Sequence, residues 1–173
     1  MSADVRDMQP ALSNQVTTNV DLEWDKAYVN DSGVVVAMPE NELPYYDFDY
    51  SSKQWVFDLQ KARDTWWESV KRKRRQVEFG TLEHAGNVFD IDEVSQRRIQ
   101  GAVQLAGMDP AFSIDWTAAD NSVVTMDATA MVGLGAALGF YVNLVHQEAR
   151  RLRGLIESAA SEAELQQLEW IDP

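Results

Sequence analysis

One long apolar segment in the C-terminal third constrains the fold of this chain most strongly. From about Ala128 to Glu157, apolar side chains recur every three or four residues, which predicts a single long helix. Its apolar positions are Met131, Leu134, Leu138, Tyr141, Val142, Val145, Leu152 and Ile156. A helix of this length needs a packing partner, so other segments must cover its apolar face.

Further helical patterns can supply that partner. An apolar face with helical spacing begins in the segment from Ser51 and comprises Trp55, Leu59, Ala62, Trp66 and Val70. A second helix is predicted from Val94 to Ala106, with Asp90 as its N-cap and Glu93 three residues later, and it ends near Gly107. The sequence SEAE, residues 161–164, has the pattern of a capping box that opens a short last helix, which is predicted to end in LEW, residues 168–170.

Short alternating patterns separated by turn residues predict β-hairpins. In the C-terminal domain, EFGTLEH and VFDI flank a turn at residues 85–87, and FSIDWT and SVVTM flank a turn at Asp120 and Asn121. Either Thr125 or Asp127 is positioned to cap the long helix. A further hairpin is plausible near the N-terminal end, where VDLEW and VVVAM flank the turn sequence NDSG.

These patterns together predict an α+β fold that is mainly helical. We expect about three main helices with two small β-hairpins in residues 51–173, preceded by an extended acidic and aromatic arm in residues 1–50. Between the helices, the run GLGAALG, residues 133–139, superficially resembles a nucleotide-binding loop. No strand leads into it and its glycine spacing differs, so close helix packing is the better interpretation.

The charge distribution bears on the partners of this chain. The net charge is -13, which disfavours nucleic acid and anionic lipid, and there is no uninterrupted run of about eighteen apolar residues. We therefore expect a soluble chain that neither binds nucleic acid nor inserts into a membrane. Residues 51–75 are the exception, with three acidic and eight basic side chains.

Two groups of residues are candidates for protein binding. The aromatic candidates are Trp24, Tyr45, Tyr46, Phe48 and Tyr50. In the tract PYYDFDY the aromatics alternate with acids, a composition at least as typical of an interface as of a core. The second group is the basic run Lys71, Arg72, Lys73, Arg74 and Arg75, which either ends a solvated helix or docks an acidic protein surface.

The sequence gives little support for catalysis, metal binding or a cofactor. Cysteine is absent, and His84 and His146 lack the spacing of metal-binding motifs. Two clusters of acids are worth testing for acid-base chemistry: Asp90, Asp92 and Glu93, and Asp115, Asp120 and Asp127. Both clusters lie where helix caps and hairpin corners favour acids. We therefore expect no catalytic residue, no metal and no cofactor.

Three sequence blocks resemble a known family. They are FDIDEVSQRRIQGAVQLA, residues 89–106, FSIDWTAADNSV, residues 112–123, and VGLGAALGFYVNLVHQEARRLR, residues 132–153. They are similar to domain-of-unknown-function family 4376, found in bacteriophage and prophage tail-fibre, tail-tip and tail-assembly proteins. The preceding YDFDYSSKQWV and residues 67–80 also match this family. The family has no assigned catalytic residues, so the resemblance implies a context but no site.

This resemblance implies a structural or adaptor subunit of a bacteriophage tail, made in the host cytoplasm and located in the virion tail. Its expected partners are other tail proteins from the fibre, tail tip or baseplate, and a homo-oligomer is possible. One alternative is a tail-fibre assembly chaperone that is absent from the mature virion. A remote alternative is an acid-base hydrolase that acts on glycans. We expect deletion of residues 1–50 to leave the helical domain folded but unable to join its partner.

Overall fold

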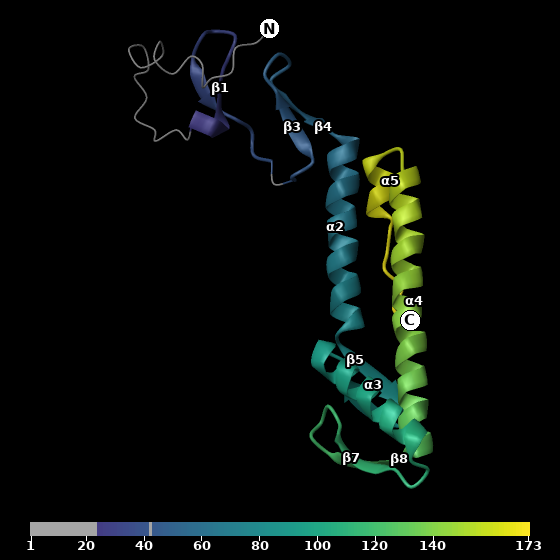
Figure 1. The fold of residues 1–173 in the computed structure, drawn as a ribbon. Coiled ribbons are helices and arrows are strands. Elements are labelled where there is room, and N and C mark those ends of the chain that lie inside the picture. Colours follow the sequence, from purple (N-terminus) through teal and green to yellow (C-terminus); the bar gives the residue numbers. More distant parts are fainter. Residues whose placement is uncertain (1–23, 42) are drawn as a thin grey trace. The chain divides into compact units, whose positions relative to one another are not determined.

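The computed structural model describes residues 24–41 and 43–173. The contacts within the chain divide it into two compact units, Met1–Thr65 and Trp66–Pro173, and each is described here by itself. Figure 1 labels the elements of both. The boundary between an arm and a domain at residues 50 and 51 stays a prediction, because it concerns independent folding.

The first unit contains the hairpin expected around NDSG. A 3-10 helix η1 (Trp24–Lys26) leads into strand β1 (Ala27–Val29), which pairs antiparallel with β2 (Val35–Ala37). In the turn, the Asn30 side-chain oxygen accepts the N–H groups of Ser32 and Val34, each at 3.0 Å. The turn prediction is confirmed. The first strand starts later than expected, and Val20 and Leu22 lie outside the described residues.

The second hairpin of this unit was not expected from the sequence. Strand β3 (Tyr46–Asp49) pairs with β4 (Gln54–Phe57), in a register that places Phe48 opposite Trp55. The prediction that Trp55 lies on a helix face is therefore wrong. Residues 54–57 are Gln-Trp-Val-Phe, and aromatic and β-branched side chains favour a strand. Helix α2 (Leu59–Glu78) begins only after Asp58, whose carboxylate accepts the N–H of Lys61 at 3.0 Å.

The second unit begins with α2 from Trp66 onward and continues into a tight hairpin. Strand β5 (Thr81–His84) pairs with β6 (Asn87–Asp90), as predicted. Helix α3 (Glu93–Met108) follows, and its N-cap is Asp92, not Asp90. Asp92 accepts the N–H groups of Val94 and Ser95, at 2.8 and 3.1 Å, whereas Asp90 pairs with Thr81 in the sheet.

The segment that leads into the longest helix is the predicted hairpin and cap. Strand β7 (Ser113–Thr117) pairs with β8 (Val123–Asp127), and Asn121 takes a positive φ of 65° in the turn. Helix α4 (Ala128–Ser158) starts immediately afterwards. Of the two possible caps, Asp127 is the one used, because its carboxylate accepts the N–H of Ala130 at 2.8 Å.

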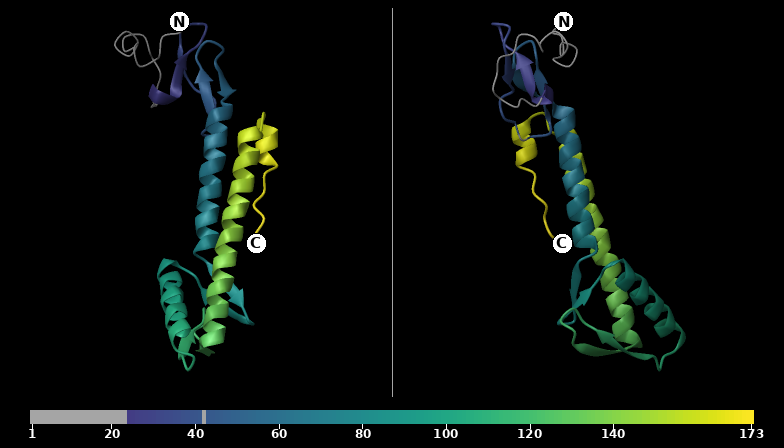
Figure 2. Two further views of the ribbon diagram at one scale, coloured as in Figure 1. Left: turned by 45° about the vertical axis from the view of Figure 1, so that its right-hand side comes forward. Right: turned by 90° about the vertical axis from the view of Figure 1, so that its left-hand side faces the viewer.

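The core of this unit lies where α3 and the two hairpins pack on the first half of α4 (Figure 2). Its buried side chains include Phe89, Ile91, Ile99, Met126, Met131, Leu134 and Leu138. A Cβ atom on Gly135 would lie 2.5 Å from Cγ2 of Val103, so α3 approaches the α4 backbone closely. The prediction that GLGAALG serves close helix packing is confirmed at this glycine.

The last helix also follows its sequence signal. Helix α5 (Glu162–Gln166) is capped by Ser161, whose hydroxyl accepts the N–H of Glu164 at 3.3 Å. The helix ends before Leu168, whereas the sequence suggested that it would include Trp170. The α+β, mainly helical class is confirmed, with helices α2, α3 and α4 as the main elements of the described residues.

Candidate docking surface on helix α2

The exposed face of α2 carries a row of polar and basic side chains that ends in a phenylalanine. Its members are Glu68, Lys71, Arg72, Arg75, Gln76 and Phe79, and we call this row the α2 face. Their positions, 68, 71, 72, 75, 76 and 79, follow one another at alternating intervals of three residues and one residue. Residues three and four apart are neighbours on a helix surface, so all six lie on one side of the helix. The predicted basic run supplies three of them. The other three were not predicted, although their spacing from Lys71 could have indicated them.

The basic run does not act as one patch. Lys71 pairs with Glu68, Lys73 lies 3.4 Å from Asp172, and Arg74 lies 4.0 Å from Glu78. Among the residues that the structure describes, no carboxylate lies within ion-pair distance of Arg72 or Arg75, and both side chains are exposed. These two guanidinium groups are therefore the available cations of the run.

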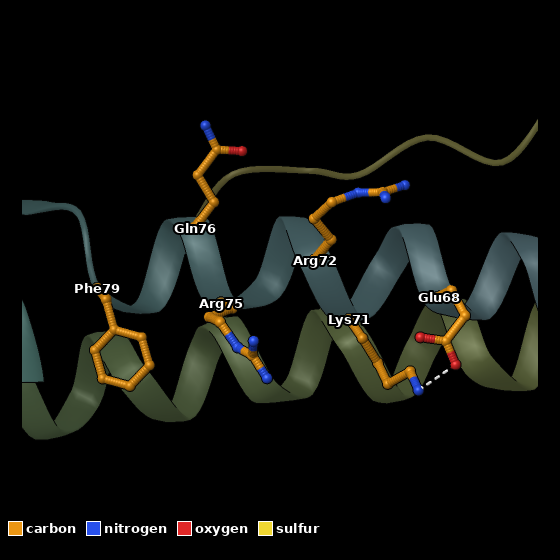
Figure 3. Close-up of a pocket in the computed structure, with 6 residues that line it drawn as sticks. All are labelled: Glu68, Lys71, Arg72, Arg75, Gln76 and Phe79. Carbon is orange, nitrogen blue, oxygen red and sulfur yellow. Dashed lines mark hydrogen bonds and ion pairs between the residues drawn. The ribbon is translucent and has the colours of Figure 1, made fainter.

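The α2 face is hollowed rather than flat. The six side chains line an open depression of about 600 Å³, and Figure 3 shows how they project from the helix. In this view Arg75 and Phe79 point to the same side, while Arg72 and Gln76 point to the other. Phe79 is 37% exposed, which gives the end of the depression an apolar wall. A carboxylate next to an apolar side chain on a partner would match these groups.

Contacts on other sides of α2 hold it along α4. The Arg153 guanidinium lies over the ring of Trp67, 4.9 Å from its centroid, and His146 Nε2 lies 3.3 Å from the Glu78 carboxylate. These contacts join two turns of α2 to two turns of α4. The α2 face is thus presented on a helix whose orientation is fixed within its unit.

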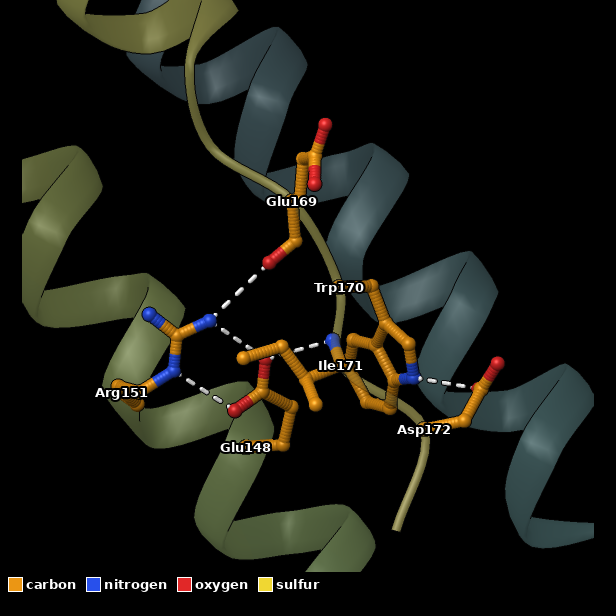
Figure 4. A network of polar contacts seen from close by, with 6 residues as sticks. All are labelled: Glu148, Arg151, Glu169, Trp170, Ile171 and Asp172. Atoms are coloured by element: carbon orange, nitrogen blue, oxygen red, sulfur yellow. Dashed lines mark hydrogen bonds and ion pairs between the residues drawn. The ribbon is translucent and has the colours of Figure 1, made fainter.

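The segment after α5 adds a third support, shown in Figure 4. Glu148 accepts two hydrogen bonds from Arg151, at 2.6 and 2.7 Å, and one from the backbone N–H of Ile171 at 3.0 Å. The hydrogen bonds from Arg151 are the main reason that the pKa of Glu148 is lowered, and the same contact raises the pKa of Arg151. Arg151 also donates to the carbonyl of Glu169 at 3.0 Å. The segment is therefore fastened along α4.

The aromatic binding candidates lie in the first unit, where they pack against each other. Phe48 contacts Tyr28, Tyr50 and Trp55, with ring centroids 5.1 to 5.3 Å apart. Tyr46 packs on Phe57 at 5.5 Å. Tyr45 is only 4% exposed, whereas Tyr46, Phe48 and Tyr50 are half-buried. Trp24 belongs to η1.

The aromatic binding candidates thus differ in how much of each side chain is exposed. Tyr45, the residue before strand β3, is covered, whereas Tyr46 and Phe48 lie on one face of β3 and are only partly covered. Tyr46, Phe48 and Tyr50 retain exposed surface, so their role in binding stays a prediction.

Five of the six acidic candidates for catalysis have side-chain partners, and the sixth, Asp90, is an exposed residue at the end of strand β6. Thr125 donates to Asp115 at 2.7 Å across the β7–β8 pair, and Asp120 accepts the N–H of Ser122 at 2.9 Å in the turn. Asp92 and Asp127 cap helices, and Glu93 lies 3.7 Å from Arg97. The two clusters thus hold turns and helix ends in place.

The polar residues of α3 follow the same pattern. The sequence alone is compatible with two roles for Ser95, Gln96, Arg98 and Gln100: a polar network to the β7–β8 hairpin, or solvent exposure. Gln96 donates to the carbonyls of Glu78 and Ile91, at 2.9 and 3.0 Å, so it joins α3 to the end of α2. Ser95 donates to Asp92 at 2.9 Å. Arg98 and Gln100 are exposed.

No metal-binding arrangement occurs in residues 24–41 and 43–173, where no three His, Cys, Asp or Glu side chains converge. Of the two histidines, His146 contacts Glu78, and His84 lies beside Gly133 of α4.

Comparison with known families gives one match. The model of a domain of unknown function, DUF4376, matches residues 61–171. The chain belongs to this family. No curated protein and no solved structure matches the chain. The DUF4376 segment includes the whole α2 face and the core around α3 and α4, whereas the aromatic tract at residues 45–50 precedes it.

Proposed function

We propose that this chain is a structural or adaptor subunit of a bacteriophage tail, in the fibre, tail-tip or baseplate region, and that it acts by binding other tail proteins. The phage context rests on the sequence resemblance, which extends over most of the DUF4376 segment. The mode of action rests on the α2 face. Its two exposed arginines, Arg72 and Arg75, have no ion-pair partner among the described residues, in a chain of net charge -13.

The α2 face favours an acidic protein surface as its partner. Arg72 and Arg75 offer forked donors that fit carboxylates, and Phe79 adds an apolar contact at the end of the same row. The overall negative charge opposes binding to nucleic acid, whose phosphates it repels. Because α2 is held by contacts to α4, little backbone conformational entropy is lost when a partner binds.

The partners of the acids support binding over catalysis. A general acid or base must reach a substrate, yet Asp92 and Asp127 are engaged with helix N-termini and Asp115 with Thr125. Their hydrogen bonds account for these aspartates without a reaction. We therefore expect no glycan hydrolysis, and Asp115→Asn should leave particle function unchanged in a plaque assay.

The first experiment reverses the charge of the α2 face. The double variant Arg72→Glu/Arg75→Glu should stay folded, because neither side chain has an ion-pair partner in the described residues, and it should fail to enter particles. The control is Arg98→Glu/Arg150→Glu, which changes the net charge equally at exposed positions of α3 and α4. Incorporation is measured by complementing a deletion mutant and quantifying the chain in purified particles. Equal incorporation of both variants would contradict the proposal.

A second experiment tests the aromatic residues of the first unit. Deletion of residues 1–50 removes β3 and leaves β4 unpaired, so removal of residues 1–57 is cleaner and keeps the α2 cap Asp58. If the arm supplies attachment, this variant keeps the helical signal of the second unit in circular dichroism but is missing from particles. Normal incorporation would exclude a role for the arm and leave the α2 face as the attachment surface.

A further inference from the structure

One face of α4 is apolar yet exposed in the second unit. Val132, Phe140 and Leu144 are 45%, 72% and 46% exposed, and with Ala136 they form a row with a spacing of four residues. Helix α4 is long and apolar enough to cross a membrane by length and composition alone, and only 22% of its most apolar window is buried. An exposed phenylalanine in such a row marks an interaction surface.

A hollow lies next to this row, between α3 and α4. Its volume is about 440 Å³, and its walls include Val103 of α3 and Gly139 and Val142 of α4. A Cβ atom on Gly139 would have nothing within 4 Å, so this glycine leaves open space instead of admitting a neighbouring helix. Gln100 and Gln104 supply neutral amides at the α3 edge. The hollow can therefore accept an apolar side chain.

The projecting ring and the hollow are neighbours on the same helix. Gly139 and Phe140 are consecutive, so they lie about 1.5 Å apart along the axis and about 100° apart around it, with Ala136 between them on the surface. If two α4 helices pack in parallel around a symmetry axis along their length, Phe140 of each copy faces Gly139 of the other at nearly the same height. The surface is thus complementary to itself under cyclic symmetry.

Charge also favours a second copy as the occupant. From Ala128 to Gln147 there is no Asp, Glu, Lys or Arg, so the net charge of -13 causes no close repulsion across a contact between two such faces. The face from Ala128 to Gln147 extends about 30 Å at about 1.5 Å per residue. With the adjoining edge of α3 it is about 20 Å wide, which gives on the order of 600 Å² per copy, or about 1,200 Å² in total, at the lower limit of a standard interface.

We infer that this chain self-associates through parallel α4 helices, with Phe140 of one copy seated in the hollow at Gly139 of the next. The assembly is a closed ring of two or more copies that buries Val132, Ala136 and Leu144 along its axis. This self-association does not depend on the proposed tail function. The residues of this contact and those of the α2 face do not overlap.

Sedimentation velocity of the full chain tests the self-association. The wild type should sediment as an oligomer, and Phe140→Glu should raise the dissociation constant at least ~30-fold, as expected for a central aromatic residue of an interface. The matched control is Val123→Glu, which places the same charge on a 66% exposed valine of the β7–β8 hairpin. The control should sediment as the wild type does.

The reciprocal variant Gly139→Leu separates self-association from misfolding and from membrane binding. It fills the hollow and adds helix propensity, so the chain should become more resistant to urea while its oligomer weakens. A helix that binds lipid would instead bind vesicles of neutral phospholipid more strongly after this change. A monomeric wild type, or an oligomer unaffected by both Phe140→Glu and Gly139→Leu, overturns the inference.

Discussion

The two glycines at positions 135 and 139 of α4 form a matched pair for testing how closely α3 packs on α4. In Gly135→Ala the new Cβ would lie 2.5 Å from Val103, about 0.9 Å closer than the 3.4 Å at which ordinary contact begins. Replacing glycine by alanine in a helix gains about 1 kcal/mol of stability. Overpacking a filled core costs about 1–3 kcal/mol. The net effect should be a destabilisation of about 0–2 kcal/mol.

Gly139→Ala brings the same gain without the clash, because nothing lies within 4 Å of its Cβ position. It should stabilise the protein by about 1 kcal/mol, so the two variants should differ by about 1–3 kcal/mol. Urea unfolding followed by far-ultraviolet circular dichroism, at a concentration where the chain is monomeric, measures this difference. Val103→Ala should relieve the clash of Gly135→Ala specifically. Equal stabilisation by both alanine variants would refute the close packing.

Further predictions concern the cap of α4 and the segment fastened along it. Asp127→Ala removes the acceptor for the Ala130 N–H and should lower the free energy of unfolding by about 1 kcal/mol in the same urea assay. Asp127→Asn keeps a side-chain oxygen that can accept this N–H, so it should lower the free energy of unfolding much less. Hydrogen bonds from Arg151 lower the pKa of Glu148 below its ordinary value of 4.5, so the folded state stabilises the charged form. This stabilisation is complete above about pH 4.5 and is lost as the pH falls through the lower, folded pKa. The protection factor of the Ile171 amide, its intrinsic exchange rate divided by the measured rate at the same pH, should therefore fall on acidification, and Glu148→Gln should show low protection at every pH. An unchanged protection factor in that variant would contradict the role assigned to Glu148.

Much of the second unit could be predicted from its sequence because local signals and burial agree there. The apolar spacing of α4, the turn at Asp120 and Asn121, and the box at Ser161 each describe interactions between neighbours in sequence. The N-cap of α3 was misplaced by two residues, from Asp92 to Asp90. Both are aspartates, and only pairing with Thr81 in the sheet excludes Asp90.

The first unit was harder to predict because its register depends on contacts distant in sequence. Trp55 fits the helical spacing of α2, yet it lies opposite Phe48 in a hairpin and donates to the carbonyl of Pro39 at 2.8 Å. Tertiary packing thus overrides the local period. The docking surface was predicted only in part for a similar reason. The basic run was visible in the sequence, but only the structure distinguishes Arg72 and Arg75 from their paired neighbours.

The most direct test of the proposed tail function is quantitative mass spectrometry of phage particles purified from cells that carry the gene for this chain. A structural or adaptor subunit should be present in a fixed ratio to other tail proteins, and this ratio should persist through repeated purification. Detection in infected lysate but not in particles would contradict the proposal and identify an assembly factor instead.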